Sequence, residues 1–499
     1  MKKFRDIFIL LLFFILSSCS ETSINKYVTE NTYPEIFPDY KNVTVPYKIA
    51  PLNFYLRQPG DKSLLCVDGK EQKLKISSEN GKFILPSRKW KNLLEKNKGG
   101  KIKLSIFIKK GETWKKYKPF FITIASDPID QYLVYRLIEP GYELWNKMGI
   151  YQRNIYNYKE SAIYENKMTE NNCVNCHSFC MQNPHKMMFH LRSQYGGTIL
   201  IQKDKIEKLN TKTKQTMSSL VYPYWHPSGK YIAFSVNKIK QDFYLNHKNR
   251  AEVFDSRSNV VVYDIAKHEI FTSPLLISDK KLETFPGFSA DGKTLYFCSA
   301  KSFPVPEKSD SVKYNLCSIS FDPNTRTFGE KVNTLYNAKI MDGSASFPRM
   351  SPDGKFLLFT VSAYGTFPIW HKEADLYMLD LKTNKYVNMD IINSDDVDSY
   401  HSWSSDSRWI VLSSRRGDGL YTRLYIAYIG KDGKTGKAFL LPQKDPAFYD
   451  DFMKSYNIPE MVKGKVDVDS YLIARKAMGT NGNAVTFNLK RDTVLKINK

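Results

Sequence analysis

The chain has 499 residues, of which 42% are hydrophobic and 14% aromatic. These fractions exclude an intrinsically disordered chain, and the length predicts roughly two or three folded domains. The formal net charge of +23 at pH 7 favours anionic partners such as lipid headgroups, polyanionic glycans or acidic proteins. Much of this charge is lysine scattered along the chain, which is also typical of an ordinary solvated surface.

The N-terminus has the features of an export signal. A short basic region, residues 1–5, precedes an apolar run at residues 7–16 that is too short to span a membrane. The sequence that follows, LSSC, ends at Cys19 and resembles the cleavage box of bacterial lipoproteins. The resemblance implies that residues 1–18 are removed and that Cys19 is lipidated. The alternative is an ordinary signal with an incidental cysteine. We therefore expect an outer-membrane lipoprotein of the cell envelope, held by its lipid anchor, for which nucleic acid is not a partner.

Two regions follow the signal. Residues 19–43 are polar and contain two prolines, so we expect a tether. Residues 44–127 contain short runs of strand-forming residues separated by Pro-Gly, Asp-Gly, Asn-Gly and Gly-Gly turn signals. One short helix is expected over residues 86–96, where Ser87 begins an amphipathic pattern. The size and the strand spacing predict an immunoglobulin-like β-sandwich.

Residues 128–187 are first aromatic-rich and then polar, and we interpret them as a connector. Near its end lies the pentapeptide CVNCH, from Cys173 to His177. This Cys-x-x-Cys-His pattern is the form on which c-type haem is attached, because two thiols at this spacing can each form a thioether to a haem vinyl group. The histidine that follows directly then becomes an axial ligand of the iron. The pattern therefore predicts covalent haem c.

The haem hypothesis gives several residues a role. Cys173 and Cys176 hold the thioethers, and His177 is the proximal ligand. Arg192 is a candidate partner for a haem propionate, with a surface arginine as the plain alternative. The sixth iron position is either open or taken by one of four residues. Two of them flank Phe189 and are preferred, although both also suit a buried structural position: Met188 and His190, followed by Met187 and His185.

Other interpretations of the cysteines stay open. A zinc site would use three cysteines and one histidine, but it lacks a second pair of ligands farther along the chain. A redox disulfide between Cys173 and Cys176 lacks the βαβ pattern of thioredoxin. Cys298 and Cys317 flank a predicted hairpin and are either paired or buried as free thiols. The zinc candidates are Cys173, Cys176, Cys180, and His177 or His185.

From residue 188 onward the chain repeats itself. Each copy combines an aromatic residue, a turn of the Ser-Pro-Asp-Gly type and an alternating strand. The turn needs an Asp that bonds its own backbone and a Gly that adopts a positive φ. With the further strands that follow, each unit has the size of a four-stranded propeller blade. The copies lie at residues 221–235, 285–297, 347–359 and 401–412.

These repeats predict a mainly β protein in which residues 188–499 form a β-propeller with five or six blades, six being preferred. A degenerate unit precedes the copies at residues 196–201, and residues 484–489 are expected to close the ring. The repeats resemble the TolB-like β-propeller family. With CVNCH, the whole chain is similar to bacterial lipoproteins that join a c-type haem motif to such a propeller. The resemblance implies an exported binding scaffold, but a fold alone does not supply a function.

Two functions agree with these patterns. The first is a membrane-tethered monohaem protein that transfers electrons or senses a redox ligand, while its propeller docks an envelope protein or redox partner. The second is a TolB-like envelope scaffold in which haem or metal is structural. The chain contains no Gly-x-Ser-x-Gly elbow, His-Glu-x-x-His helix or phosphate-binding glycine loop. The one enzyme activity kept open is that of a haem peroxidase.

Overall fold

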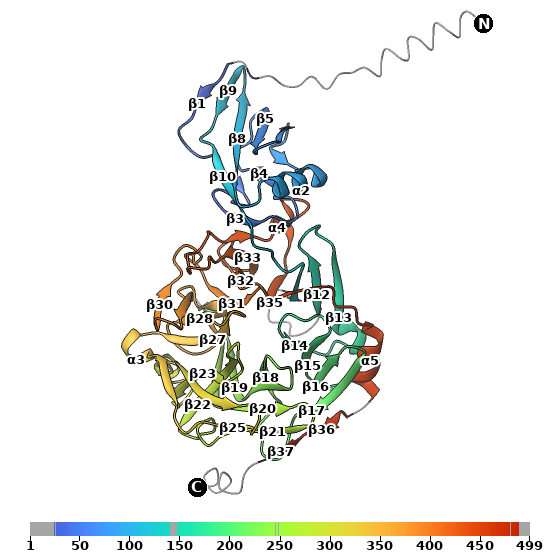
Figure 1. Ribbon diagram of the computed structural model, residues 1–499, viewed down its shortest axis with the longest axis vertical. Coiled ribbons are helices and arrows are strands. Elements are labelled where there is room, and N and C mark those ends of the chain that lie inside the picture. The colour runs from blue at the N-terminus through green and yellow to red at the C-terminus, as the bar shows by residue number, and fades with distance from the viewer. Residues whose placement is uncertain are drawn as a thin grey trace, which may run out of the picture.

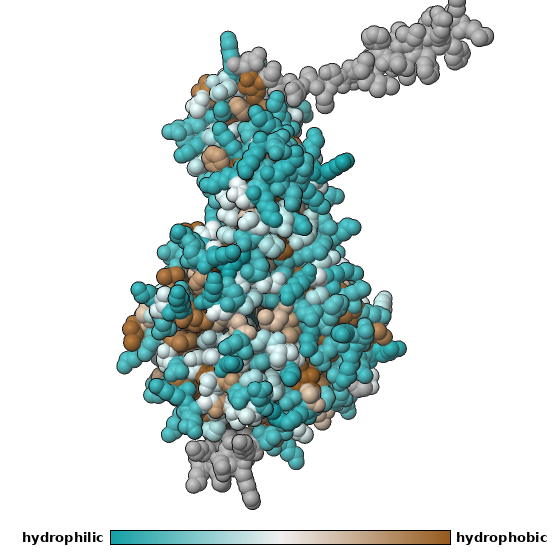
Figure 2. All heavy atoms as spheres, in the orientation of Figure 1, coloured by the Kyte–Doolittle hydropathy of each residue, from teal (hydrophilic) through white to brown (hydrophobic). Residues whose placement is uncertain are grey.

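The computed structural model describes residue 24 and residues 26–139, 147–244, 246–247, 249–479 and 481–488. In these residues the protein is mainly β, as predicted, and a smaller N-terminal domain is seated on the rim of a larger ring of sheets (Figure 1). The face drawn in Figure 2 is mostly hydrophilic, with hydrophobic side chains in small patches. No described helix has the length and apolar character needed to cross a membrane. The predicted lipidation site Cys19 lies outside the described residues.

The N-terminal domain is a sandwich of a seven-stranded and a three-stranded sheet with one helix, as expected. In β8 apolar and polar side chains alternate, which places one face of the larger sheet on the core. Helix α2 (Ser87–Lys96) packs Trp90 and two leucines into the same core. The strands are β1 (Val28–Thr29), β2 (Ile36–Phe37), β3 (Thr44–Pro46), β4 (Phe54–Leu56), β5 (Lys62–Asp68), β6 (Lys73–Ser78), β7 (Lys82–Phe83), β8 (Lys101–Lys110), β9 (Thr113–Lys116) and β10 (Phe120–Ala125).

The larger domain is a propeller with six blades in the described part of the chain. Within each blade the strands are given from the innermost outward. Blade 1 has β35 (Ser455–Val462), β11 (Tyr132–Ile138), β12 (Met148–Asn154) and β13 (Glu160–Glu165). Blade 2 has β14 (Val174–Phe179), β15 (Lys186–Leu191), β16 (Gly197–Gln202) and β17 (Lys205–Asn210). Blade 3 has β18 (Val221–Trp225), β19 (Tyr231–Phe243), β20 (Ala251–Asp264) and β21 (Glu269–Phe271).

The second half of the ring follows the same plan. Blade 4 has β22 (Lys281–Phe288), β23 (Thr294–Lys301), β24 (Asn315–Asp322), β25 (Thr327–Phe328) and β26 (Asn333–Tyr336). Blade 5 has β27 (Ser344–Met350), β28 (Phe356–Ser362), β29 (Asp375–Asp380) and β30 (Lys385–Asn388). Blade 6 has β31 (Asp398–Trp403), β32 (Trp409–Ser414), β33 (Arg423–Tyr428) and β34 (Phe439–Leu440). Three further helices are α3 (Ala338–Met341), α4 (Phe448–Asp451) and α5 (Ser470–Gly479).

Two expected boundaries are corrected by the sheet order. The tether expected at residues 19–43 is shorter than predicted, because β1 and β2 lie within it and pair with β9 and β4. Residues 128–187, expected to be a connector, contain all three outer strands of blade 1 and the inner strand of blade 2. Aromatic side chains of these strands, such as Tyr135 and Tyr164, are therefore blade core, and the repeat is hidden because blade 1 takes its inner strand from elsewhere.

The ring is closed by a strand from near the C-terminus. β35 pairs antiparallel with β11 and completes blade 1, so strands from both ends of the domain share one sheet. The strand expected to close the ring at residues 484–489 has a different place in the described part. There, β36 (Asn483–Ala484) and β37 (Thr486–Phe487) pair in parallel with the outer strands of blades 2 and 3 (Figure 1). They brace two neighbouring blades from outside.

The predicted turns connect the first two strands of the blades. In blade 5, Ser351 Oγ donates to Asp353 Oδ1 at 2.7 Å, the N–H of Gly354 bonds the carbonyl of Ser351 at 2.9 Å, and Gly354 has a φ of +74°. The same bonds recur at the turn of blade 4. Each such turn is therefore satisfied internally, as the Asp and Gly requirement predicts.

Cys298 and Cys317 lie on adjacent strands of blade 4, but they are not opposite each other. Cys298 faces Leu316 across the ladder and Cys317 faces Phe297, so the two thiols point to opposite faces of the sheet. Both are free and buried, in two different hydrophobic clusters. Of the two alternatives, the buried free thiol is the one that this register permits.

Ring closure can be tested with two methionines of the C-terminal segment. Met461 of β35 is 1% exposed and lies in the main core, whereas Met453 is 63% exposed. We expect Met461→Ala to lower the free energy of unfolding by about 2–5 kcal/mol, because it leaves a cavity at the closing strand. Met453→Ala should change it by less than about 0.5 kcal/mol. Urea denaturation of both variants measures the difference, and equal stabilities would contradict closure by β35.

Candidate functional site in the propeller channel

A bulge repeats in the innermost strand of every described blade. At each bulge the register with the neighbouring strand shifts, and one residue other than glycine takes a positive φ between 44° and 52°. Such a φ is uncommon for these residue types, so its recurrence at matching positions marks a designed feature of the fold. From blade 1 to blade 6 the residues are Ile458, Cys176, Tyr222, Phe285, Phe347 and Tyr400.

The CVNCH motif occupies the bulge of blade 2. In four blades the residue after the positive-φ position is proline, which has no N–H to lose from the disrupted ladder. In blades 2 and 6 it is a histidine, His177 and His401. The sequence CHSF that begins at Cys176 therefore stands where blade 6 has YHSW. The second half of the haem-type motif is also one copy of the propeller repeat.

Four of the bulge residues form an aromatic belt around the axis of the ring. The ring centroids of Tyr222 and Phe285 are 4.4 Å apart, those of Phe285 and Phe347 are 4.1 Å apart, and those of Phe347 and Tyr400 are 4.6 Å apart. Cys176 occupies the fifth position and Ile458 the sixth. The bulges thus direct one side chain from each blade toward the centre.

A cavity of about 450 Å³ runs along this centre. Residues of all six inner strands line it, including Cys176, His177 and three members of the belt. Its volume lies within the range of about 300–1,000 Å³ that is usual for sites of small organic ligands. The belt divides its walls into two chemically different parts.

The arginine chamber, defined by Arg136, Arg192, Arg250 and Arg415, lies at the end where the inner strands begin. Arg192 directly follows β15, and its N–H bonds the carbonyl of Cys173, which precedes β14. Arg136 is opposite Asn457, just before the bulge of β35, and the N–H of Arg415 bonds the carbonyl of Val397 just before β31. All four arginines line the cavity.

Arg136 has neutral hydrogen-bond partners, and Arg415 has an aromatic one, with the carboxylates of Asp396 and Asp418 near enough to favour its charged form. Arg136 donates to the carbonyl of Val174 and to the side-chain oxygen of Asn175 at 3.1 and 2.7 Å. Arg415 is 5% exposed, and its guanidinium carbon lies 3.1 Å from the Trp370 ring centroid. Burial lowers the pKa of Arg415 to about 9, so it remains cationic at neutral pH. Its Nε and one terminal nitrogen bond to no described residue.

The histidine chamber, defined by His177, His401, Arg349 and Glu460, lies beyond the bulges. Both histidines are buried, and none of their four ring nitrogens has a hydrogen bond of good geometry to a described residue, although backbone carbonyls lie near both rings: that of Ile458 near His177, and those of Phe347 and Leu358 near His401. Burial, followed by the nearby charges of Arg136 and Arg349, lowers the pKa of each histidine to about 3. Burial also raises the pKa of Glu460 to about 8, with its Oε1 at 3.8 Å from His177 Nε2. At pH 7 these three side chains are therefore mainly uncharged.

The structure brings together only part of the predicted haem site. Cys176, His177 and Arg192 line the cavity, whereas the buried Cys173 does not. The preferred candidates for the sixth ligand also lie elsewhere: Met188 is in a separate core cluster, and His190 Nδ1 is 2.8 Å from Thr198 Oγ1. The zinc candidates do not gather either, since the described residues contain no group of three or more His, Cys, Asp or Glu side chains that fits a metal ion.

These positions fit covalent haem incompletely. The unpartnered, neutral imidazole of His177 suits an iron ligand, and Cys176 opens into the same cavity. A second thioether would also require Cys173 to face that cavity, but the side chain of Cys173 does not line it. We therefore derive no chemical step through haem, and its attachment stays a prediction.

Sequence reasoning missed the other polar residues of the cavity. Arg136 lies in the segment taken as a connector, and Glu460 lies in the closing strand, which carries no turn motif. His401 stood in a recognised repeat copy. Aligning CHSF with YHSW would have revealed that His177 and His401 hold equivalent positions, which is the one signal available in the sequence.

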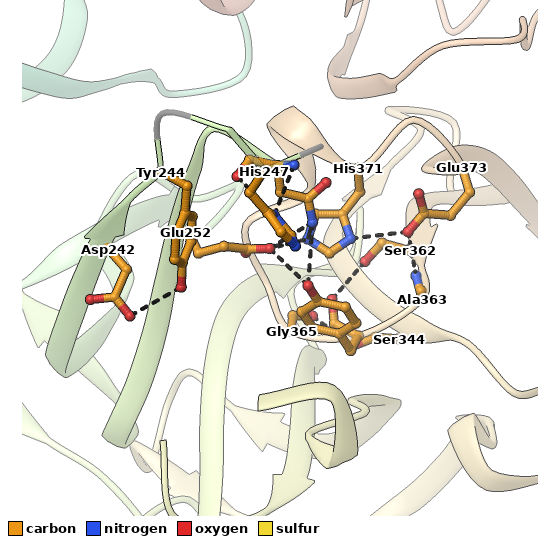
Figure 3. A network of polar contacts seen from close by, with 12 residues as sticks. Asp242, Tyr244, His247, Glu252, Ser344, Ser362, Ala363, Gly365, His371 and Glu373 are labelled. Atoms are coloured by element: carbon orange, nitrogen blue, oxygen red, sulfur yellow. Dashed lines mark hydrogen bonds and ion pairs between the residues drawn. The ribbon is translucent and has the colours of Figure 1, made fainter. Parts of the chain in front are cut away.

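The long hairpin formed by β19 and β20 contributes to the wall of the cavity beside the arginine chamber. The strands β19 and β20 extend beyond their neighbours, and Phe243, Arg250 and Val253 from this extension line the cavity. Glu252 fastens the hairpin to blade 5, because its Oε1 lies 3.2 Å from His371 Nε2 (Figure 3). The other ring nitrogen of His371 lies 3.0 Å from Glu373, so one imidazole joins two carboxylates.

Comparisons with known proteins show distant similarity only. No family model and no curated protein matches the chain. It is similar to prolyl oligopeptidase B from Galerina marginata, with 10% identity and a TM-score of 0.35, over 67% of this chain and 42% of the oligopeptidase. A tricorn protease has 14% identity and a TM-score of 0.35, over 78% and 36% of the two chains. An oligogalacturonate lyase in complex with manganese has 11% identity and a TM-score of 0.32, over 62% of this chain and 85% of the lyase. The chain thus spans less than half of the two proteases, and the propeller assignment rests on its own sheet order.

The contacts of His371 with Glu252 and Glu373, called the His371 latch below, predict that the stability of the fold depends on pH. Burial opposes its charge, but the bonds to Glu252 and Glu373 outweigh burial and raise its pKa to about 9. A raised pKa stabilises the fold fully below the unfolded value of about 6.5, and this contribution is lost as the pH rises through 9. We expect the difference in melting temperature between the natural protein and His371→Gln to shrink from pH 6.5 to pH 9.5. A constant difference over that range would contradict a charged latch.

Proposed function

We propose that this protein is a binding protein of the cell envelope that captures an anionic organic ligand in its propeller channel. The observation that carries the proposal is the arginine chamber. Among the described residues, Arg415 is nearly fully buried with two guanidinium nitrogens that have no hydrogen-bond partner, and the hydrogen bonds of Arg136 go to neutral groups. Other arginines of the propeller have carboxylate partners, such as Arg416 with Asp398 at 2.6 Å.

Physical chemistry supports an anion at this place. A buried cation costs free energy unless a counter-charge and hydrogen bonds compensate it. The planar guanidinium offers paired N–H donors that match a carboxylate, sulfate or phosphate group. The one carboxylate in the histidine chamber, Glu460, is mainly protonated at pH 7 and contributes little negative charge. A ligand that brings its own anionic group therefore gains hydrogen bonds from guanidinium nitrogens that have no partner among the described residues.

The proposal keeps the TolB-like scaffold as its setting. Turns of the Ser-x-Asp-Gly type after the inner strands support that resemblance. The lipoprotein box at Cys19 supports tethering to the membrane by a lipid anchor, with an envelope protein as a further partner. The channel would then serve ligand binding, while the outer surface serves that partner.

Charge removal inside the channel tests the proposal. Binding is measured by calorimetry with four probes: citrate, a uronic-acid disaccharide, ATP and anilinonaphthalene sulfonate. We expect at least one probe to bind, and Arg415→Gln to weaken it about 10- to 100-fold, because a hydrogen bond to a charged group contributes about 1.5–3 kcal/mol. The control Arg475→Gln removes an exposed charge of α5 and should leave affinity unchanged. Binding of no probe, or equal loss in both variants, would contradict an anion site in the channel.

A second candidate function is that of a monohaem c-type protein in electron transfer or redox sensing. Cys176 and His177 favour it, because they share the cavity and the His177 ring nitrogens are free for a ligand. Protein exported from cells with haem-attachment machinery should then show a c-type absorption spectrum and a mass increase of one haem. Both signals should be lost in Cys176→Ala. The control Cys298→Ala changes a thiol buried in blade 4 and should keep them. A colourless protein of bare polypeptide mass ends this candidate.

A further inference from the structure

We infer that the channel ligand is an acidic saccharide, an inference that rests on the anion-binding function proposed above and names its substrate class. The two parts of the cavity differ in what they offer. The arginine chamber offers guanidinium groups, and the histidine chamber offers buried imidazole nitrogens that have no partner among the described residues. One ligand that fills the cavity therefore needs an anionic end and a neutral polar end.

The polar end is defined by buried atoms that have no partner in the described part of the protein. Apart from three arginine nitrogens, six of them belong to side chains that line the cavity: both ring nitrogens of His177, both of His401, the Oε1 of Gln182 and the Oγ of Ser402. Buried polar atoms are normally paired, so a cluster without partners in one wall indicates a missing ligand or ordered water. The atoms come from blades 2 and 6, which flank the closing strand of blade 1.

Hydroxyl groups match this cluster best. A neutral imidazole has one donor and one acceptor nitrogen. A serine hydroxyl can donate and accept a hydrogen bond, and the amide oxygen of Gln182 can only accept one. A hydroxyl group on the ligand both donates and accepts, so neighbouring hydroxyls can satisfy such a mixed wall without adding charge. A further anionic group would instead find acceptors there that repel it.

The aromatic belt supplies the middle of the site. Tyr222, Phe347 and Tyr400 line the cavity between the two chambers. Aromatic rings bury apolar surface while the tyrosine hydroxyls keep a polar handle, so they suit the C–H face of a sugar ring. A ring that carries several hydroxyls on one side and a carboxylate or sulfate on the other meets all three surfaces.

Other ligand classes leave part of the cavity unmatched. An inorganic polyanion would engage the arginines and leave the six polar atoms without partners. A neutral sugar would bring no anionic acceptor to the two guanidinium nitrogens of Arg415 that have no partner among the described residues. A nucleotide carries phosphate and a flat base, but it offers fewer hydroxyls to the wall of His177 and His401.

The propeller repeat itself provides a variant that should keep the fold. Four blades carry proline at the position of His401, so His401→Pro restores the common form of the bulge and removes the imidazole. The bulge also leaves this residue outside the ladder register, which pairs Ser399 and Ser402 with β32. His268→Gln, in the outer part of blade 3, is the matched control.

Calorimetry with digalacturonic acid, the neutral disaccharide cellobiose, citrate and ATP tests the inference. We expect digalacturonic acid to bind, cellobiose to bind at least tenfold more weakly, and His401→Pro to weaken the acidic disaccharide by about tenfold while leaving citrate unchanged. Arg415→Gln should weaken the disaccharide and citrate alike, and His268→Gln neither. Unfolding curves confirm that the variants keep the fold.

The outcomes separate the two proposals. Binding of citrate or ATP that depends on Arg415, without binding of digalacturonic acid or without any effect of His401→Pro, overturns the acidic saccharide and keeps the anion site. Equal binding of cellobiose also overturns the saccharide's acidic character. Failure of every anion to bind overturns the anion site itself, and the saccharide inference with it.

Discussion

The antiparallel pairing of β35 with β11 is the constraint on which the channel depends. Through this pairing a strand from near the C-terminus becomes the inner strand of blade 1. Only then do six inner strands surround one axis, with a bulge in each that turns a side chain toward the centre. Glu460 enters the cavity wall by the same pairing, beside His177 of the neighbouring blade.

The chemistry of the channel lies where the blades depart from their common pattern. Blades 3, 4 and 5 present an aromatic residue and a proline at the bulge, which form an apolar wall. Blades 2 and 6 replace the proline by histidine, and blade 2 also replaces the aromatic residue by Cys176. The three blades around the closure thus hold both cavity histidines and Glu460, whereas the aromatic belt runs from blade 3 through blades 4 and 5 to Tyr400 of blade 6.

The propeller was predictable because each Ser-Pro-Asp-Gly turn acts locally, through Asp353 or Gly354 and their own backbone. The helix at Ser87–Lys96 followed from its own amphipathic pattern in the same way. Blade 1 was not predictable, because its strands come from residues far apart and lack that turn. The cavity residues Arg136, Arg415 and Glu460 were missed for a related reason. Charged residues in a sequence are usually predicted to lie on the solvent-exposed surface. The closed ring shows that these three line the channel instead.

The order of synthesis has a consequence for how the channel is filled. Cys176 and His177 are made long before β35, while the segment that completes the circle and braces its outside comes last. In the closed ring, β35 packs beside β14, the strand that contains both residues, and Cys176 and His177 are only 3% and 2% exposed. Attachment of a bulky group to either side chain therefore requires a ring that has opened or has not yet closed.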